Sequence, residues 1–178
     1  MRKKAKITSI LGCEGVFLIK KKIILLIEKR KEMEDKQNQL EQMKEEARRR
    51  NLLRFVHAQD SGGIYDGTTT YVEALAEVRA GHKRGHWMWY VFPQMKGLGH
   101  TEIAEFYGIN GREEAYAYIA HPILRERLVE ITEAVLNNEH SAYSIFGDDI
   151  IKFRACMLLF ASVSDIPVFK QVISEYRW

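Results

Sequence analysis

The sequence predicts a compact, multihelical, all-α domain over residues 51–178, preceded by a charged extension over residues 1–50 that is helical or disordered. Residues that begin and end helices bracket several segments in which apolar residues recur with helical spacing. No run alternates apolar and polar residues with a period of two, which is the pattern of a half-buried strand. At this length the domain can bury a hydrophobic core without disulfides or metals.

A capping box predicts the first helix with a clear start. Thr70 and Glu73 have the spacing at which a hydroxyl and a carboxylate each accept a hydrogen bond from the other residue's backbone N–H. The predicted helix covers residues 71–80 and ends at Gly81. We expect its buried face to carry Val72, Leu75 and Val78.

Two further helices meet at a proline. Asn110 with Glu113 predicts a cap for a helix through Ala120, and Pro122 fits the first turn of the next helix. The second of these helices has one apolar stripe with helical spacing, formed by Leu124, Leu128, Ile131 and Val135.

The last two helices also have candidate caps. Asp148 or Asp149 is predicted to cap a strongly apolar helix that runs through Val163. Because this helix is so apolar, we expect it to be the central one. Ser164 and Asp165 are predicted to cap the last helix.

Charge is unevenly divided along the chain. Residues 51–178 carry 12 Lys and Arg against 16 Asp and Glu, a net charge of −4, whereas residues 1–50 carry 15 against 8, a net charge of +7. The basic isoelectric point therefore describes the extension, and we do not expect the domain to bind nucleic acid. The two cysteines, Cys13 and Cys156, do not suggest a disulfide framework, which fits a reducing, cytoplasmic location.

The beginning of the extension is basic and has short apolar runs, but it does not have the pattern of a transmembrane helix. Residues 20–22 are lysines and interrupt the apolar residues before they reach the roughly 18 that a spanning helix needs. No small-residue cleavage site follows, so a secretory signal is not predicted. Two alternatives stay open: an amphipathic contact with a membrane surface, and a biological start at Met33 with residues 1–32 translated from upstream.

Residues 28–50 favour a helix because they are rich in Glu, Lys, Arg and Gln and contain no Pro or Gly. Their apolar residues have a coiled-coil spacing over two heptads: Met33, Leu40, Met43 and Ala47. Prediction of a coiled coil needs at least about three or four heptads. A solvated helix is therefore favoured, and weak self-association through residues 28–50 is the alternative.

Residues 82–100 combine a basic cluster, a run of apolar and aromatic residues, and a return that contains glycine. Lys83 and Arg84 can bind a phosphate or carboxylate, and Trp87 or Trp89 can stack on a planar ring. The aromatic run is also typical of a hydrophobic core, in which case the basic flank is either a ligand site or only a solvated rim.

A second group of charges, Asp149, Lys152 and Arg154, lies on the apolar helix predicted to be central. Asp149 and Lys152 are separated by one helical turn and can pair with each other. Arg154 lies between two apolar residues, and the functional interpretation is that it points inward and binds a ligand anion beside the two tryptophans. The structural alternative is a salt bridge from Arg154 to Glu102 or Glu105.

The stretch RAGHKRGHWMWYVFPQMKGLG at 79–99 resembles the signature of an uncharacterised, largely bacterial family, domain-of-unknown-function family 1810, whose members are often mislabelled "calpastatin". Further matches follow in order: RFVHAQ at 54–59, YGI at 107–109, AYIAHPIL at 117–124, IFG at 145–147, DIIKFRACMLLFASVS at 149–164 and PVFKQVISEY at 167–176. The resemblance covers about residues 52–176. It implies a compact multihelical domain and no established activity.

Two features depart from the family pattern. Members tend to have a small hydroxyl residue where Ala155 stands and a threonine where Leu158 stands. Members also usually continue past the last helix, and a tail that closes the site would be missing here.

The first functional hypothesis is a binding site for a small anionic, ring-containing metabolite, such as a nucleotide or an ADP-ribose-like compound, with or without a reaction on it. The predicted ligand-binding residues are Lys83, Arg84, His86, Trp87, Trp89, Gln94, Gly97, Asp149, Lys152 and Arg154. No catalytic base, cofactor motif or metal-ligand spacing is recognisable, so no cofactor or metal is predicted. The alternative hypothesis is a protein-interaction module without catalytic activity that docks a partner through the aromatic run.

Overall fold

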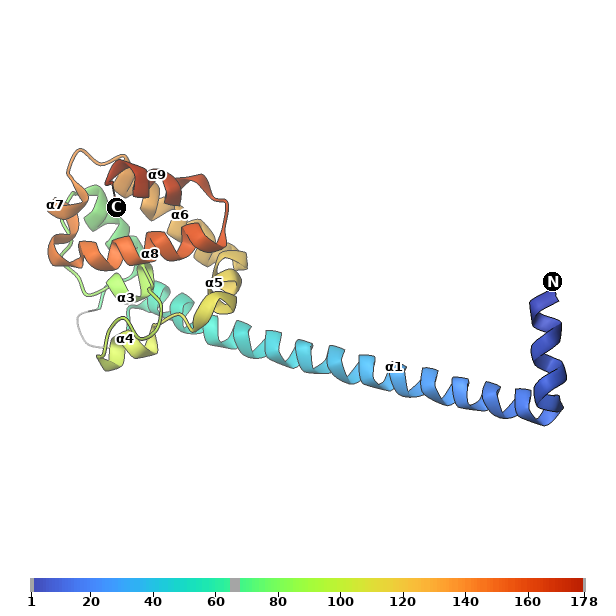
Figure 1. The fold of residues 1–178 in the computed structure, drawn as a ribbon. Helices are drawn as coiled ribbons and strands as arrows, with labels where there is room; N and C mark the ends of the chain where they lie inside the picture. The colour runs from blue at the N-terminus through green and yellow to red at the C-terminus, as the bar shows by residue number, and fades with distance from the viewer. Residues whose placement is uncertain (1, 65–67, 178) are drawn as a thin grey trace. The chain divides into compact units, whose positions relative to one another are not determined.

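The computed structural model of the chain describes residues 2–64 and 68–177, with side chains from Phe17 onwards. The chain divides into two compact units, Met1–Ala47 and Arg48–Trp178. The first unit consists of helix, and the second contains the hydrophobic core (Figure 1).

The regular elements are helical throughout the described ranges, where the one β-type pairing is an isolated bridge between Met95 and Ile109. The predicted all-α class is therefore confirmed. The first helix, α1 (Arg2–Ser61), contributes to both units. Among the residues that the structure describes, no helix combines the length and the apolar composition needed to cross a membrane.

The other elements belong to the second unit. In chain order they are α2 (Tyr71–Arg79), α3 (Met88–Val91), α4 (Glu102–Phe106), α5 (Gly111–Ala120), α6 (Pro122–Leu136), α7 (Ala142–Phe146), the 3-10 helix η1 (Gly147–Asp149), α8 (Ile150–Val163) and α9 (Pro167–Glu175).

Helix α8 packs one apolar face into the core, while its other face carries exposed Ile151 and Leu158, so the prediction that it is central is not confirmed. It packs against α5, α7 and α9, while α6 packs against α2, α5 and α9 (Figure 1). The face of α8 turned to the core carries large apolar side chains and a thiol, among them Phe153, Cys156, Met157 and Phe160. This arrangement buries the apolar sides of α6, α8 and α9 in one core.

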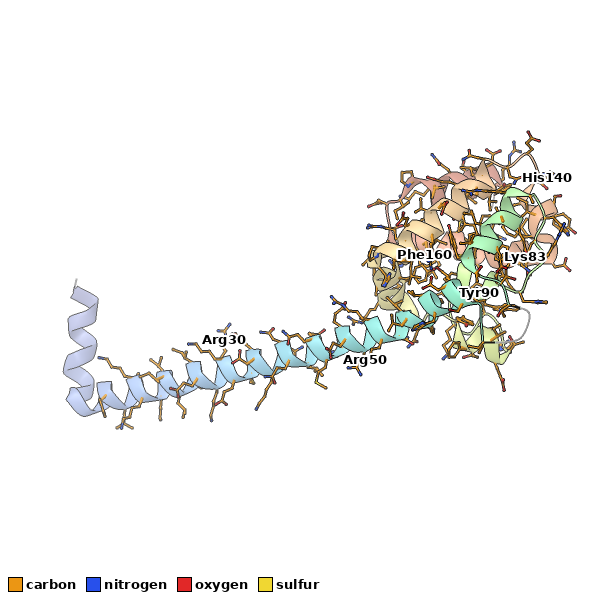
Figure 2. The ribbon with its side chains drawn as sticks, turned by 180° about the vertical axis from the view of Figure 1, so that it is seen from behind. Arg30, Arg50, Lys83, Tyr90, His140 and Phe160 are labelled. Carbon is orange, nitrogen blue, oxygen red and sulfur yellow. The ribbon has the colours of Figure 1, made fainter. Side chains whose placement is uncertain are left out.

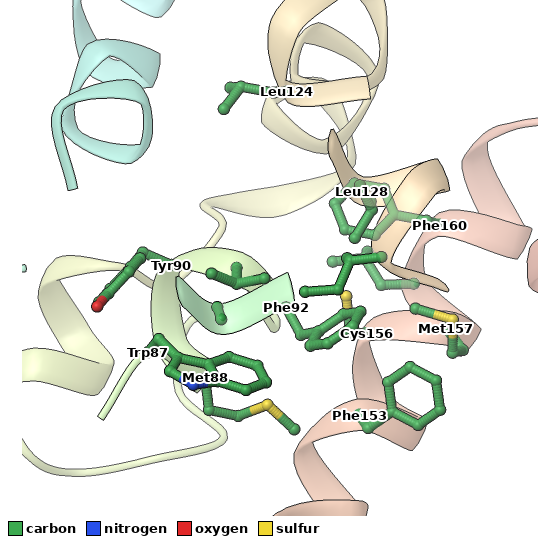
Figure 3. Packing of buried hydrophobic residues seen from close by; sticks show 14 of the residues in the cluster. Trp87, Met88, Tyr90, Phe92, Leu124, Leu128, Phe153, Cys156, Met157 and Phe160 are labelled. Atoms are coloured by element: carbon green, nitrogen blue, oxygen red, sulfur yellow. The ribbon is translucent and has the colours of Figure 1, made fainter. Parts of the chain in front are cut away.

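The aromatic run 87–92 forms part of this core, and only Trp89 among its six residues is not fully enclosed. The ring centroid of Phe92 lies 4.9 Å from that of Phe153 and 5.8 Å from that of Phe146. Phe92 directly follows α3, so these edge-on aromatic contacts tie the short helix to α7 and α8. Phe92 and Phe153 are labelled in Figure 3. The interpretation of the run as hydrophobic core is confirmed.

The local signals for α2 and α6 are largely confirmed. Thr70 and Glu73 form the capping box, and the stripe predicted for α6 is buried. Val72 was wrongly assigned to the core, since it is 73% exposed. Tyr71 takes the buried position instead, because its hydroxyl donates to the Glu130 carboxylate (2.7 Å) and holds α2 against α6.

Asn110 occupies the predicted cap position of α5, but its side chain makes no capping hydrogen bond and the partner carboxylate is one residue further on. The backbone N–H of Asn110 donates to the carboxylate of Glu114 rather than to that of Glu113. Tertiary contacts cause the difference, because Arg48 binds Glu113 (2.7 Å) while Arg54 binds the buried Glu114 (2.7 Å).

The predicted cap of α8 is right in position but not in hydrogen bonding, and the predicted cap of α9 is wrong. Asp149 stands at the cap position of α8 without a capping hydrogen bond, because its carboxylate binds two lysines instead. Ile166 occupies the cap position of α9, and the Ser164 hydroxyl donates back to the carbonyl of Phe160 (2.8 Å). The polar side chains at both helix starts therefore bind groups other than the backbone N–H groups of the helix they precede.

Candidate functional site

A carboxylate that the sequence analysis did not single out, Glu77 of α2, organises the loop before α3. It accepts hydrogen bonds from the backbone N–H groups of Arg84 (2.7 Å) and Gly85 (3.0 Å). The indole N–H of Trp87 donates to the same carboxylate (2.7 Å). Burial raises the pKa of Glu77, but these donors outweigh burial and lower the pKa below its usual value.

Trp87 is consequently a structural residue in this conformation. Its side chain is fully buried, so neither ring face is open to a ligand (Figure 3). Its contacts with other aromatic rings come from the core, with Phe92 and Phe146 each at 6.2 Å between centroids. Of the two tryptophans predicted to stack on a ligand, Trp89 is partly accessible and Trp87 is not.

Two lysines from separate parts of the chain converge on Asp149 at the end of η1. The ammonium of Lys83 lies 2.8 Å from one carboxylate oxygen of Asp149, and the ammonium of Lys152 binds the other oxygen. We call these three residues the Lys83–Asp149–Lys152 cluster; Lys83 is labelled in Figure 2. Burial raises the pKa of the Asp149 carboxyl, but its bonds to Lys152 and Lys83 outweigh burial and lower the pKa.

The cluster adjoins the aromatic run through two cation–π contacts. The ammonium of Lys152 lies 4.9 Å from the ring centroid of half-buried Trp89. The ammonium of Lys83 lies 5.5 Å from the ring centroid of Trp87. The structure therefore brings together Lys83, Trp89, Asp149 and Lys152 from the predicted set, and Trp89 is the tryptophan with part of its ring at the surface.

The other predicted residues lie around this group in different environments. Arg84, His86 and Arg154 are exposed, so the prediction that Arg154 points inward is wrong. Arg154 lies on the outer face of α8, which also carries exposed Ile151 and Leu158, because Phe153 and Cys156 occupy the inner face. Glu105, suggested as a partner of Arg154, instead pairs with Lys96 (3.5 Å).

Gln94 and Gly97 lie in the return that follows the aromatic run. The backbone carbonyl of Gln94 accepts from Ile109 (2.8 Å), which fixes the return against the start of α5. Gly97 is exposed, and its φ of +88° is a conformation that favours glycine. Gln94 also borders a cavity of about 10 Å³ beside Trp89, which has room for about one water molecule.

A larger surface cavity, about 480 Å³, lies at the ends of α2 and α6, away from the predicted residues. It is lined mainly by polar groups: Arg79, Glu130, Glu133, Ala134, Asn137, Asn138, Glu139 and His140. The amide of Asn138 donates to the carbonyl of Val78 (2.8 Å) and joins the two helix ends. The sequence analysis missed this cavity, because its lining becomes continuous only when α2 packs on α6.

Two groups with reactive chemistry, Cys156 and His121, have structural roles. No three or more His, Cys, Asp or Glu residues in the described ranges are arranged to hold a metal ion. Cys156 is buried, and desolvation raises the pKa of its thiol well above the usual value, which makes it unreactive. His121 lies at the junction of α5 and α6. Its side-chain Nδ1 accepts a hydrogen bond from the backbone N–H of Leu124 (3.5 Å) and caps α6. The cluster beside Trp89 therefore offers binding groups: cations, a carboxylate and an aromatic ring.

The second unit is thus a compact helical domain with a lysine–aspartate cluster beside a half-buried tryptophan. Residues 49–177 match the family model described as "Protein of unknown function (DUF1810)", and the chain belongs to this family. The resemblance seen in the stretch at 79–99 is confirmed.

A solved structure is consistent with this assignment. The chain is similar to the conserved hypothetical protein Rv1873 from Mycobacterium tuberculosis, with 41% identity and a TM-score of 0.64. The similarity covers 70% of this chain and 86% of that protein. A comparison with curated proteins finds no match.

Proposed function

We propose that the domain binds a small anionic, ring-containing metabolite, such as a nucleotide or an ADP-ribose-like compound, at the Lys83–Asp149–Lys152 cluster and Trp89. The observation that carries the proposal is the convergence of two ammonium groups on one carboxylate, next to an indole that reaches the surface. A cytoplasmic location is part of the proposal, since the free thiol of Cys156 suits a reducing compartment.

The charge of the cluster favours an anionic ligand. One carboxylate faces two ammonium groups, so the three side chains together carry a net charge of +1. Lys83, Asp149 and Lys152 are 13%, 21% and 31% exposed, so water screens this charge only in part. A phosphate or carboxylate between the two lysines would balance the excess charge through charge-assisted hydrogen bonds.

The position of Lys152 connects anion binding to ring stacking. Its ammonium now lies over the ring of Trp89. A lysine has a long, flexible stem, so an incoming anion can draw the ammonium away from the indole. The face of Trp89 that Lys152 leaves would then be open to a planar ring of the same ligand.

The remaining predicted residues are proposed as outer contacts. Arg84, His86 and Arg154 are exposed and can meet a second anionic group of a longer ligand. Gln94 and Gly97 belong to the return beyond Trp89, where an amide and an open backbone can contact polar ligand atoms. No general base stands out among these residues, so the proposal is limited to binding.

The protein-interaction hypothesis assumed that the aromatic run 87–92 forms an exposed docking surface. A docking site needs large apolar side chains on an exposed patch. In the aromatic run 87–92, Trp89 alone is partly accessible, and the other five side chains are enclosed in the core. Ligand binding is therefore the function that the geometry supports better.

Thermal-shift screening against nucleotides and phosphorylated metabolites tests the proposal. A ligand present at 100 times its dissociation constant should stabilise the folded protein by about 2.7 kcal/mol. The change Lys152→Gln should reduce the shift, because it removes the cation shared by Asp149 and Trp89. Lys170→Gln is the matched control, since Lys170 of α9 forms an exposed pair with Asp165, which precedes the helix (3.3 Å).

Two results would count against this site. A screen in which no anionic ring compound raises the melting temperature removes the main support for ligand binding. A compound whose shift is reduced equally by Lys152→Gln and Lys170→Gln binds by general charge attraction or at another place.

A further inference from the structure

Apolar side chains are exposed at intervals of seven residues along α1 within the unit Met1–Ala47. The residues are Ile19, Leu26, Met33 and Leu40, followed by exposed Ala47. The four large side chains are between 43% and 67% exposed. A row of large apolar groups in water is unfavourable, so this row requires a partner surface.

The heptad spacing of the apolar residues becomes visible because α1 is continuous. Residues 28–50 considered alone contain only two heptads of the pattern. Because α1 is one helix from Arg2 to Ser61, the same spacing extends back to Leu26 and Ile19. Four successive heptad steps, from Ile19 to Ala47, then place apolar residues on one side of the helix.

We propose that the partner is a second copy of this chain, and that residues 19–47 of the two copies form a parallel, two-stranded coiled coil. In a heptad written a to g, the apolar row occupies position d. The preceding a positions hold Ile23, Arg30, Gln37 and Lys44. In a parallel pair each a residue faces its own copy, so Arg30 and Lys44 each meet a like charge, which weakens the pair and makes the dimer reversible.

Charge complementarity selects this partner and this orientation. With the apolar row at d, Lys29 and Lys36 occupy g positions, and Glu34 and Glu41 occupy the following e positions. In a parallel pair in register, Lys29 of one copy lies opposite Glu34 of the other, and Lys36 lies opposite Glu41. An antiparallel pair would place lysine against lysine and glutamate against glutamate, which disfavours it.

The carboxylates can serve both contacts. Within one helix, Arg30 binds Glu34 (3.1 Å) and Lys44 binds Glu41 (2.9 Å). Each carboxylate has two oxygens and about four acceptor sites, so it can bind a lysine of the second copy as well. The side chains around Arg30 in Figure 2 extend from the helix surface, where a second copy can reach them.

The test uses the full chain and two charge-reversed variants, Lys29→Glu/Lys36→Glu and Glu34→Lys/Glu41→Lys. Sedimentation equilibrium of the wild type should show a concentration-dependent dimer. Each variant alone should have a dissociation constant raised by about tenfold or more, because every cross-pair becomes repulsive. An equimolar mixture of the two variants should recover dimers, because lysine again faces glutamate.

Circular dichroism of each variant controls for loss of helix, and the first variant keeps the pairs at Glu34 and Glu41 within the helix. Variants that dimerise like the wild type, or a mixture that does not recover dimers, overturn the parallel coiled coil. A wild type that stays monomeric while co-sedimenting with vesicles containing phosphatidylserine also overturns it. That outcome would assign the apolar row and the lysines at 20–22 to an anionic membrane surface.

Discussion

Trp87 and Trp89 lie two residues apart, and each adjoins a carboxylate with several partners, but the two surroundings differ in charge. Glu77 accepts uncharged N–H donors, one of them from the fully buried Trp87. Asp149 binds two ammonium groups, one of which covers the half-buried Trp89. The first group is committed to holding the fold, whereas the second joins two ammonium groups on partly exposed side chains. Burial and charge balance therefore separate a structural tryptophan from a candidate binding tryptophan.

Removing the two indoles should give the largest contrast. Trp87→Ala is expected to lower the free energy of unfolding by about 3–5 kcal/mol, because it leaves a cavity in the core and removes a donor to Glu77. Trp89→Ala should cost less than about half of that, because its ring is already partly solvated. Urea unfolding followed by circular dichroism measures both values. Equal losses would show that the two tryptophans are equally structural.

Neutralising the first carboxylate should have the next largest effect. Glu77→Gln is expected to lower the free energy of unfolding by about 1.5–3 kcal/mol, since bonds from Arg84, Gly85 and Trp87 to a charged acceptor are weakened. Glu126→Gln on the exposed side of α6 is the control, with an expected change within about 0.5 kcal/mol. A difference between the variants below the error of urea unfolding would contradict the role given to Glu77.

Neutralising the second carboxylate should destabilise less and should depend on anions. Asp149→Asn is expected to cost about 1–2 kcal/mol at pH 7, because two half-buried ammonium groups lose their counter-ion. Inorganic phosphate should recover part of this loss in Asp149→Asn but not in Glu77→Gln. Phosphate titrations followed by thermal unfolding make the comparison, and equal recovery in both variants would argue against an anion site at the cluster.

The same variant changes the response to acid. The folded-state pKa of Asp149 is lowered, so its contribution to stability is complete above the unfolded pKa and is lost as pH falls through the folded pKa. Wild-type stability should therefore decrease below about pH 4, and the decrease should be smaller in Asp149→Asn. Urea unfolding at a series of pH values tests this, and identical slopes would show that Asp149 does not contribute.

The smallest expected effect on stability belongs to Lys152→Gln. Its pair with Asp149 is partly solvated, so the free energy of unfolding should change by less than about 1 kcal/mol. Acrylamide quenching of Trp89 should increase, because the ammonium no longer covers its ring. The measurement uses a Trp178→Phe background, and fully buried Trp87 should remain shielded. Unchanged quenching would show that Lys152 does not control access to Trp89.

Interactions within one or two helical turns could be predicted from the sequence. The capping box of Thr70 with Glu73 and the pair Asp149 with Lys152 both depend on spacing along a single segment. The buried stripe of α6 was predictable for the same reason, since its periodicity identifies one face of a helix. The aromatic run likewise indicated core, because large apolar side chains leave water wherever the fold allows.

The sequence by itself therefore determined the helical class, the core character of residues 87–92 and the charges available near them. The tertiary structure decided how those charges are used: Lys83 reaches Asp149, Glu77 holds the loop before α3, and Arg154 faces outward. Local spacing sets which side of a helix is apolar, but the packing of distant segments sets which neighbour each polar side chain meets. The free energy of a charge depends on that neighbour and on its exposure to water, and both exist only in the folded chain.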